Sequence, residues 1–175
     1  MKKMLVLSGI VALACIGPLS AAVEKGDVNI ELMANIADIS AEAATGDSSA
    51  TQISGTVGQF ITDNIQVQAG LSAMLLKVLG TDVDVYSVAV KSSYYFMPDN
   101  TYSPYLGAQL AWGTLDTAGG DGDGMIYGPV AGILYELSET NDIFLEYQYD
   151  LFTGDLDDAL KNAHMVSFGI SHKFK

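Results

Sequence analysis

The chain has 175 residues, enough for one domain. Hydrophobic residues make up 49% of it and the mean hydropathy is +0.26, yet after the first two dozen residues no apolar run approaches the roughly 20 residues that a membrane-spanning helix needs. The formal charge of −13, without a single arginine, argues against nucleic acid as a partner, because phosphate neutralisation needs clustered basic side chains.

The first 22 residues have the pattern of a secretory signal peptide. Lys2 and Lys3 supply the positive end, an apolar stretch follows, and small residues at its end fit a cleavage site. A lipoprotein signal that ends at Cys15, with acylation as the anchor, is the alternative. Cleavage of the signal peptide would remove the only cysteine and leave residues 23–175 without a disulfide and with a formal charge of −15.

The rest of the chain alternates between apolar and polar residues. In residues 28–36 the even positions are apolar, and Asn29, Glu31 and Asn35 lie between them. Alternation with a period of two is typical of a strand with two different faces. Eight segments follow this pattern, and the predicted strands cover residues 28–36, 52–61, 65–75, 84–96, 105–113, 127–137, 143–152 and 164–174.

The connections between these strands alternate in length. The three short ones, which resemble turns, are residues 62–64, 97–103 and 138–142. The four that are mostly longer and polar are residues 40–50, 76–83, 114–125 and 153–163. Short turns that alternate with long loops are typical of an up-and-down barrel in a membrane.

The two faces of the predicted strands differ in charge. In the clearest strand interiors the apolar face holds no Asp, Glu or Lys, and the charges of the other face are Glu31, Lys91, Glu146, Asp150 and Lys173. A soluble barrel of the lipocalin type would instead keep apolar residues inside and charges outside. A lipid-facing charge near mid-bilayer costs about 2–4 kcal/mol, so the segregation favours an apolar face toward lipid and a polar lumen. The prediction is an all-β, eight-stranded antiparallel up-and-down transmembrane β-barrel.

Outward-facing aromatic residues are predicted to form two belts at the membrane interfaces. The belt nearer the turns consists of Tyr94, Phe96, Tyr135 and Phe174, and the belt nearer the loops consists of Tyr86, Trp112, Tyr127 and Tyr149.

Short motifs accompany the pattern. They are GQFITDNI at residues 58–65, YYF at 94–96 followed by PYLG at 104–107, and the closing VSFGISHKF at 166–174. These motifs resemble the small outer-membrane β-barrel family that includes OmpA-like and OmpX-like barrels. The resemblance implies a location in the bacterial outer membrane. It also implies a terminal aromatic residue that the barrel-assembly machinery reads, here Phe174, although Lys175 follows it.

Eight strands enclose an interior just wide enough for side chains to fill. Lys173 is predicted to pair with Glu31 or Glu146, and Lys91 to reach the same layer from the far wall, because an unpaired buried charge is costly. A lumen plugged in this way suits a structural or surface-interaction role. The alternative is a narrow porin-like channel for ions or small solutes, gated by rearrangement of the pairs.

The sequence predicts neither catalysis nor a cofactor. Ser171 and His172 are adjacent in a strand and so point to opposite faces, and His164 is expected at the membrane interface. The segment GGDGDG at 119–124 resembles one copy of a calcium-binding repeat, but a single copy favours a flexible acidic loop. The expected partners of the barrel, taken as a monomer, are outer-membrane lipid and lipopolysaccharide, the latter through weak divalent-cation bridging by acidic loops.

Overall fold

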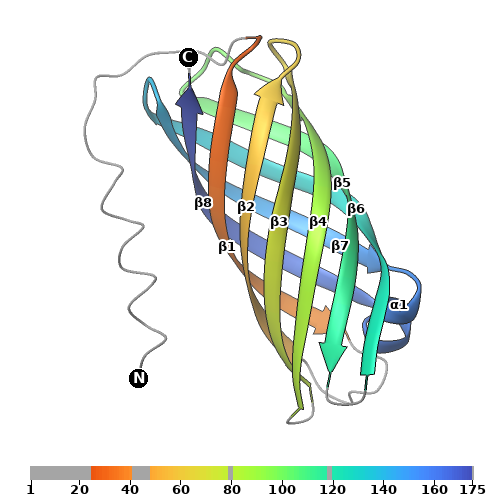
Figure 1. The fold of residues 1–175 in the computed structure, drawn as a ribbon. Coiled ribbons are helices and arrows are strands. Elements are labelled where there is room, and N and C mark those ends of the chain that lie inside the picture. The colour runs from red at the N-terminus through yellow and green to blue at the C-terminus, as the bar shows by residue number, and fades with distance from the viewer. Residues whose placement is uncertain (1–24, 41–47, 79–80, 118–119, 175) are drawn as a thin grey trace.

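The computed structural model describes residues 25–40, 48–78, 81–117 and 120–174, so the predicted signal peptide, with its Cys15 alternative, lies outside the described residues. Eight strands and one short helix, α1 (Asp155–Ala159), make up this part of the chain (Figure 1). In chain order the strands are β1 (Val28–Ser40), β2 (Ser48–Phe60), β3 (Ile65–Val78), β4 (Thr81–Tyr95), β5 (Tyr102–Thr117), β6 (Gly120–Ser138), β7 (Asn141–Phe152) and β8 (Asn162–Phe174).

The strands form one closed barrel in which each pairs antiparallel with the next in the chain. The barrel closes where β1 meets β8, and Val28 lies opposite both Gln59 of β2 and Phe174 of β8. Closure leaves no strand edge without a hydrogen-bonding neighbour. The predicted eight-stranded antiparallel up-and-down topology is therefore confirmed.

The two ends of the barrel differ. One end, uppermost in Figure 1, carries the short connections 61–64, 96–101 and 139–140 together with the end of β8, and is called the turn end below. The opposite end carries α1 and is called the loop end. Within the described ranges, α1 is the only helix, and no helix is long and apolar enough to cross a membrane.

Two of the predicted loops are wrong. Residues 76–83 and 114–125 were expected to be long polar loops, but β3 and β4 continue to Val78 and Thr81, and β5 and β6 continue to Thr117 and Gly120. The backbone ladder of a hairpin does not depend on side-chain hydropathy, so it runs on after the apolar alternation stops. Residues 120–124 of the GGDGDG segment accordingly begin strand β6 rather than forming a flexible loop.

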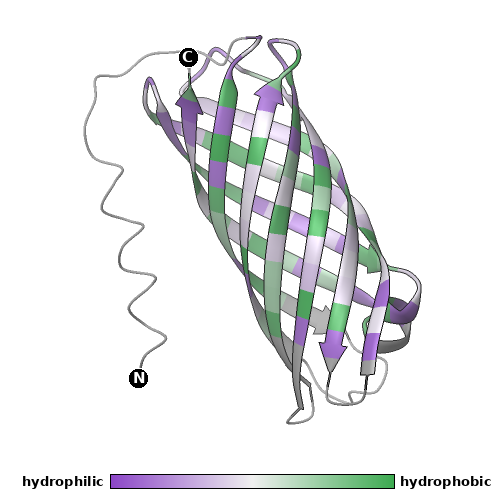
Figure 2. Ribbon diagram, in the orientation of Figure 1, coloured by the Kyte–Doolittle hydropathy of each residue, from purple (hydrophilic) through white to green (hydrophobic). Residues whose placement is uncertain are grey.

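Alternate residues of each strand point to opposite faces of the wall, which gives the banded colouring of Figure 2. Large apolar side chains are exposed on the outer face, and Ile36 and Leu71 are the most exposed of them. Close approach inside the barrel depends on small residues: a Cβ at Gly132 of β6 would lie 2.4 Å from the ring of Tyr105. The outer face thus carries large apolar side chains, and small residues allow close packing at points inside the barrel.

Candidate functional site

The five charged residues predicted to face the lumen are all buried in the barrel interior. Their exposed fractions are at most 7%, and they are Glu31, Lys91, Glu146, Asp150 and Lys173. They come from β1, β4, β7 and β8, so strand alternation alone suffices to place them on one face.

An ion pair spans the middle of the lumen. Nζ of Lys91 lies 2.7 Å from Oε2 of Glu146, so β4 is joined to β7 across the barrel. The hydroxyl of Tyr105 donates a second hydrogen bond, 2.8 Å long, to the same oxygen. A buried pair of this kind persists when both partners are hydrogen-bonded, and removal of one partner alone is strongly destabilising.

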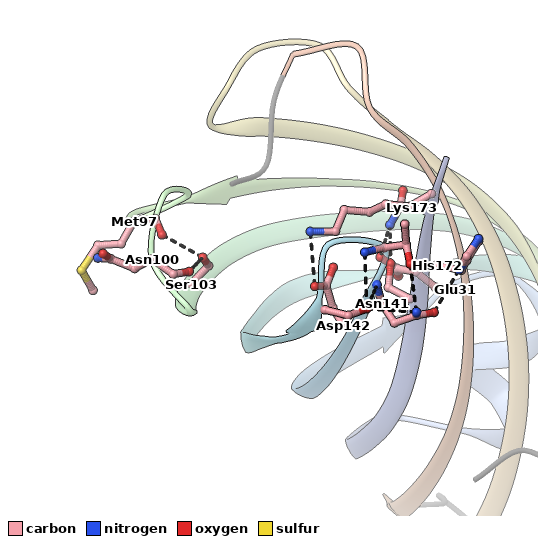
Figure 3. A network of polar contacts seen from close by, with 12 residues as sticks. Glu31, Met97, Asn100, Ser103, Asn141, Asp142, His172 and Lys173 are labelled. Atoms are coloured by element: carbon pink, nitrogen blue, oxygen red, sulfur yellow. Dashed lines mark hydrogen bonds and ion pairs between the residues drawn. The ribbon is translucent and has the colours of Figure 1, made fainter. Parts of the chain in front are cut away.

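The predicted partner of Lys173 is wrong. Its Nζ lies 3.3 Å from Oδ1 of Asp142 (Figure 3), not beside Glu31 or Glu146. Asp142 was expected in the turn of residues 138–142. Strand β7 instead begins at Asn141, so Asp142 lies within β7 and pairs with Ser171 of β8. That register puts the carboxylate on the inner face, two residues along β8 from Lys173.

Glu31 is held by neutral donors instead of an ammonium group. Its two oxygens accept hydrogen bonds from Nδ2 of Asn29 (2.7 Å) and from the hydroxyl of Thr56 (3.3 Å). The amide of Asn29 in turn accepts a bond from Gln66, which accepts one from the hydroxyl of Tyr95. This chain of bonds joins β1, β2, β3 and β4 near the turn end.

Asp150 is also held by amides. Its oxygens accept hydrogen bonds from Gln109 (2.8 Å) and Gln148 (2.7 Å). Beside it, a cavity of about 50 Å³ lies in the middle of the lumen. Most of the side chains around the cavity are polar, and the charged ones are Lys91, Glu146 and Asp150.

The lumen is not polar throughout, contrary to expectation. At the loop end the interior is an apolar cluster, formed by Ala37, Ala50, Met74, Val85, Ala111, Leu115, Ile126, Phe152, Leu156, Leu160, Ala163 and Met165. Leu156 of α1 and Leu160 just after it are 0% and 1% exposed, although they lie in a predicted polar loop. They pack into this apolar cluster at the loop end of the lumen, and α1 together with Leu160 is called the loop-end cap below.

Gly124 of β6 allows the cap to approach the wall. A Cβ at this position would lie 1.8 Å from the carbonyl oxygen of Thr153, the residue that leads into α1. The sequence did contain a signal for the cap, since Leu156 and Leu160 are four residues apart, the spacing of one helical face.

Toward the turn end, aromatic rings fill the interior. Phe60, Tyr95 and Tyr105 form a chain of contacts with ring centroids 5.2 Å and 4.9 Å apart, and Phe144 packs in the same cluster. Phe60 is the last residue of β2, yet it is only 2% exposed. The polar middle of the lumen therefore lies between an aromatic layer and an apolar one.

Six of the residues predicted for the aromatic belts are exposed on the outer wall, and they are Tyr86, Tyr94, Phe96, Trp112, Tyr127 and Phe174. Near the turn end, the rings of Tyr94 and Phe96 meet edge to face with centroids 5.3 Å apart. Near the loop end, the tilted rings of Tyr149 and His164 have centroids 4.8 Å apart. Ser171 is buried and His172 is exposed, on opposite faces as their adjacency requires. In the described part of the chain, no three His, Cys, Asp or Glu residues gather as a metal site would require.

Comparison with known proteins identifies the class. A family model described as outer membrane protein beta-barrel domain matches residues 8–174. The chain therefore belongs to the outer-membrane β-barrel family, and it is a protein of the bacterial outer membrane. A search of curated proteins finds no match.

Solved structures agree with this assignment of the fold. Neisserial surface protein A is 20% identical over 86% of this chain and 100% of its own, with a TM-score of 0.68. The N-terminal β-barrel domain of OprF from Pseudomonas aeruginosa is 18% identical over 86% and 98%, with a TM-score of 0.60. Ail, the attachment invasion locus protein of Yersinia pestis, is 15% identical over 86% and 99%, with a TM-score of 0.53.

Proposed function

We propose that this chain is a closed outer-membrane barrel that acts through its surface, as a structural or surface-interaction protein of the envelope, and does not conduct solutes. The observation that carries the proposal is the burial of Leu156 and Leu160 in the mouth of the barrel. Hydrated ions would have to pass these leucines, the central ion pair and the aromatic layer in turn. On this proposal the three layers together interrupt any aqueous path through the barrel.

The polar middle of the lumen supports the second candidate, a narrow channel. The Lys91–Glu146 pair and its neighbouring cavity would form the selective part of such a path. Conduction would require both the loop-end cap and the aromatic layer to move aside.

Conductance of the refolded protein in a planar lipid bilayer separates the two candidates. A closed barrel gives no discrete current steps, and steps in the unmodified protein would refute the proposal. The double variant Leu156→Asp, Leu160→Asp tests the cap, because two buried carboxylates would drive it out of the apolar cluster. A conservative Leu156→Met, Leu160→Met variant is the matched control.

The proposal includes the partners of each surface. The apolar outer wall contacts acyl chains, and Phe174, exposed at the end of β8, presents the aromatic residue that the barrel-assembly machinery reads. At the loop end the outer face is acidic: Asp84, Asp116 and Asp121 lie directly opposite one another on β4, β5 and β6. Contact with the phosphates of lipopolysaccharide would need divalent cations between the two negative surfaces. If a chelator changes neither thermal stability nor retention at the cell surface, that contact is ruled out.

A further inference from the structure

An open groove of about 500 Å³ lies on the outer wall at the loop end of β4, β5 and β6. Its lining includes the rings of Tyr86 and Trp112, and it also includes the carboxylates of Asp116, Asp121 and Asp123. The two rings are about half exposed, at 51% and 53%. Asp116 lies nearer the loop end of β5 than Trp112 does, so the groove has an aromatic side toward the membrane and an acidic side beyond it.

The acidic side belongs to a row of carboxylates across three strands. Asp84 of β4 is opposite Asp116 of β5, and Asp116 is opposite Asp121 of β6. These three residues are called the acidic row below, and like charges directly opposite one another in a sheet are destabilising. Strands β5 and β6 contain no Lys, Arg or His, and the one basic residue of β4, Lys91, is buried in the lumen. The three strands therefore offer the row no counter-charge of their own.

The described neighbours of the acidic row on either side are apolar or acidic. On β3, Leu75 is opposite Asp84, whereas Lys77 is opposite Asp82. On the side of α1, the carboxylate of Asp155 accepts a 3.3 Å hydrogen bond from the backbone of β6 and adds a further negative charge. Charge complementarity therefore favours a positively charged partner from outside the chain.

The spacing of the row favours several amines over one metal ion. Each strand contributes one carboxylate, and in the part of the chain that the structure describes no three His, Cys, Asp or Glu side chains gather around one point. Neighbouring members of the row are one strand spacing apart, about 4.8 Å, and the outer two are about 9.6 Å apart. Basic residues at positions i, i+4 and i+7 of a helix have a similar spacing, about 6 and 10 Å along the axis.

The aromatic side of the groove fits the other face of such a helix. The exposed rings of Tyr86 and Trp112 can contact apolar side chains, and their faces also attract ammonium groups. A helix with one basic and one apolar face lies flat in the membrane interface, which is the level of the aromatic belt. The groove thus offers carboxylates and rings in the order in which such a helix presents its two faces.

We propose that this groove binds a cationic amphipathic helical peptide that lies in the membrane interface. Its lysine or arginine side chains pair with the acidic row, and its apolar side packs against Tyr86 and Trp112. Such binding rests on the surface-interaction role proposed above and gives that role a class of partner. It does not require a closed lumen, so current steps through the barrel would leave it intact.

Fluorescence of Trp112 tests the groove directly, because this residue lines it and is the only tryptophan of the chain. The protein is folded into phosphatidylcholine vesicles with a chelator present, which removes divalent cations. It is then titrated with a tryptophan-free peptide of leucine and lysine whose lysines recur at i, i+4 and i+7. The fluorescence is expected to change saturably, and the binding to weaken several-fold at high salt. The absence of a saturable change would overturn the proposal.

A second peptide tests the match in spacing. It has the same composition, but its lysines are distributed around the whole helix. It is expected to bind several-fold more weakly, because it cannot present its lysines to the acidic row and its leucines to the rings at the same time. Equal binding of the two peptides would refute the proposed arrangement.

Matched aspartate variants locate the binding. The double variant Asp116→Asn, Asp121→Asn removes two charges of the row and is expected to weaken binding roughly 3- to 10-fold, since each exposed ion pair contributes little. The control Asp99→Asn, Asp157→Asn removes two exposed charges outside the groove and should leave binding unchanged. Equal weakening in both double variants would reduce the effect to net charge and refute the site.

An ammonium amphiphile separates a peptide from a lipid. Dodecylammonium carries the same charged group on a single acyl-like chain, but it cannot present a row of amines. It is expected to change the fluorescence of Trp112 only at amine concentrations several-fold above those of the peptide. The same saturable change at equal amine concentration would assign the groove to a lipid headgroup and overturn the proposal.

Discussion

The ion pair between Lys91 and Glu146 gives the sharpest prediction about stability. Lys91→Met keeps most of the side-chain volume and removes the charge. Among the described residues it leaves Glu146 with the hydroxyl of Tyr105 as its remaining donor, in a lumen that also holds the carboxyl groups of Glu31 and Asp150. Removal of one partner of a buried pair costs about 3–5 kcal/mol, and we expect the free energy of unfolding to fall by that amount.

Neutralising Glu146 instead of Lys91 is expected to lower the free energy of unfolding by less. Glu146→Gln keeps an oxygen that can accept from Lys91, and it lowers the excess of negative charge in the lumen. Its loss should be about 1–3 kcal/mol. The double variant Lys91→Met, Glu146→Gln leaves neither charge without its partner. Its free energy of unfolding should therefore fall by less than the sum of the two single losses.

Urea unfolding in lipid vesicles measures these values. Trp112 is the only tryptophan and lies exposed on the outer wall, so its fluorescence reports the departure of the strand from lipid. Lys25→Met, at an exposed position outside the strands, is the matched control and should change stability by no more than about 0.5 kcal/mol. Additive losses in the double variant, or a loss in Lys91→Met no greater than in the control, would refute the reasoning.

Three further predictions concern other parts of the barrel. Gly132→Ala places a Cβ 2.4 Å from the ring of Tyr105 and should cost about 1–3 kcal/mol in urea unfolding, whereas Gly55→Ala meets nothing nearer than 3.5 Å and should be neutral. Leu110→Lys puts a charge on the exposed outer wall in the middle of β5 and should cost about 2–4 kcal/mol in vesicles, unlike the same change at the rim residue Asp116; equal costs would contradict a lipid-facing wall. Phe174→Ala should slow insertion by reconstituted barrel-assembly machinery at least several-fold while leaving spontaneous refolding unchanged, and an unchanged assisted rate would remove Phe174 as the signal.

The outer wall was predictable from the sequence because every second residue of a strand that faces lipid has to be apolar. The alternation from Ile65 to Leu75 is an example, and it locates β3 without any other information. The strand ends beyond the membrane were not predictable in this way, because the hairpins continue where side chains need no longer be apolar.

The lumen was predictable only in part. Alternation identified which charges point inward, but not which of them meet, since partners depend on register and on residues such as Asp142 that resemble a turn in sequence. The apolar interior at the loop end was not predicted. There the inward-facing residues are small or apolar and the outward-facing ones are acidic, which is the reverse of the alternation in the rest of the barrel. Leu156 and Leu160 were not predicted to be buried, because the aspartates beside them made residues 153–163 resemble a polar loop.

Access of a water-soluble reagent to the middle of the lumen tests most directly whether this barrel is closed. Ser72 lines the central cavity, and Glu139 lies exposed in the turn between β6 and β7. In protein folded into lipid bilayers, a charged methanethiosulfonate reagent should modify Glu139→Cys rapidly and leave Ser72→Cys unmodified until the barrel unfolds. Modification of Ser72→Cys in the folded protein at the rate found for Glu139→Cys would contradict the closed lumen.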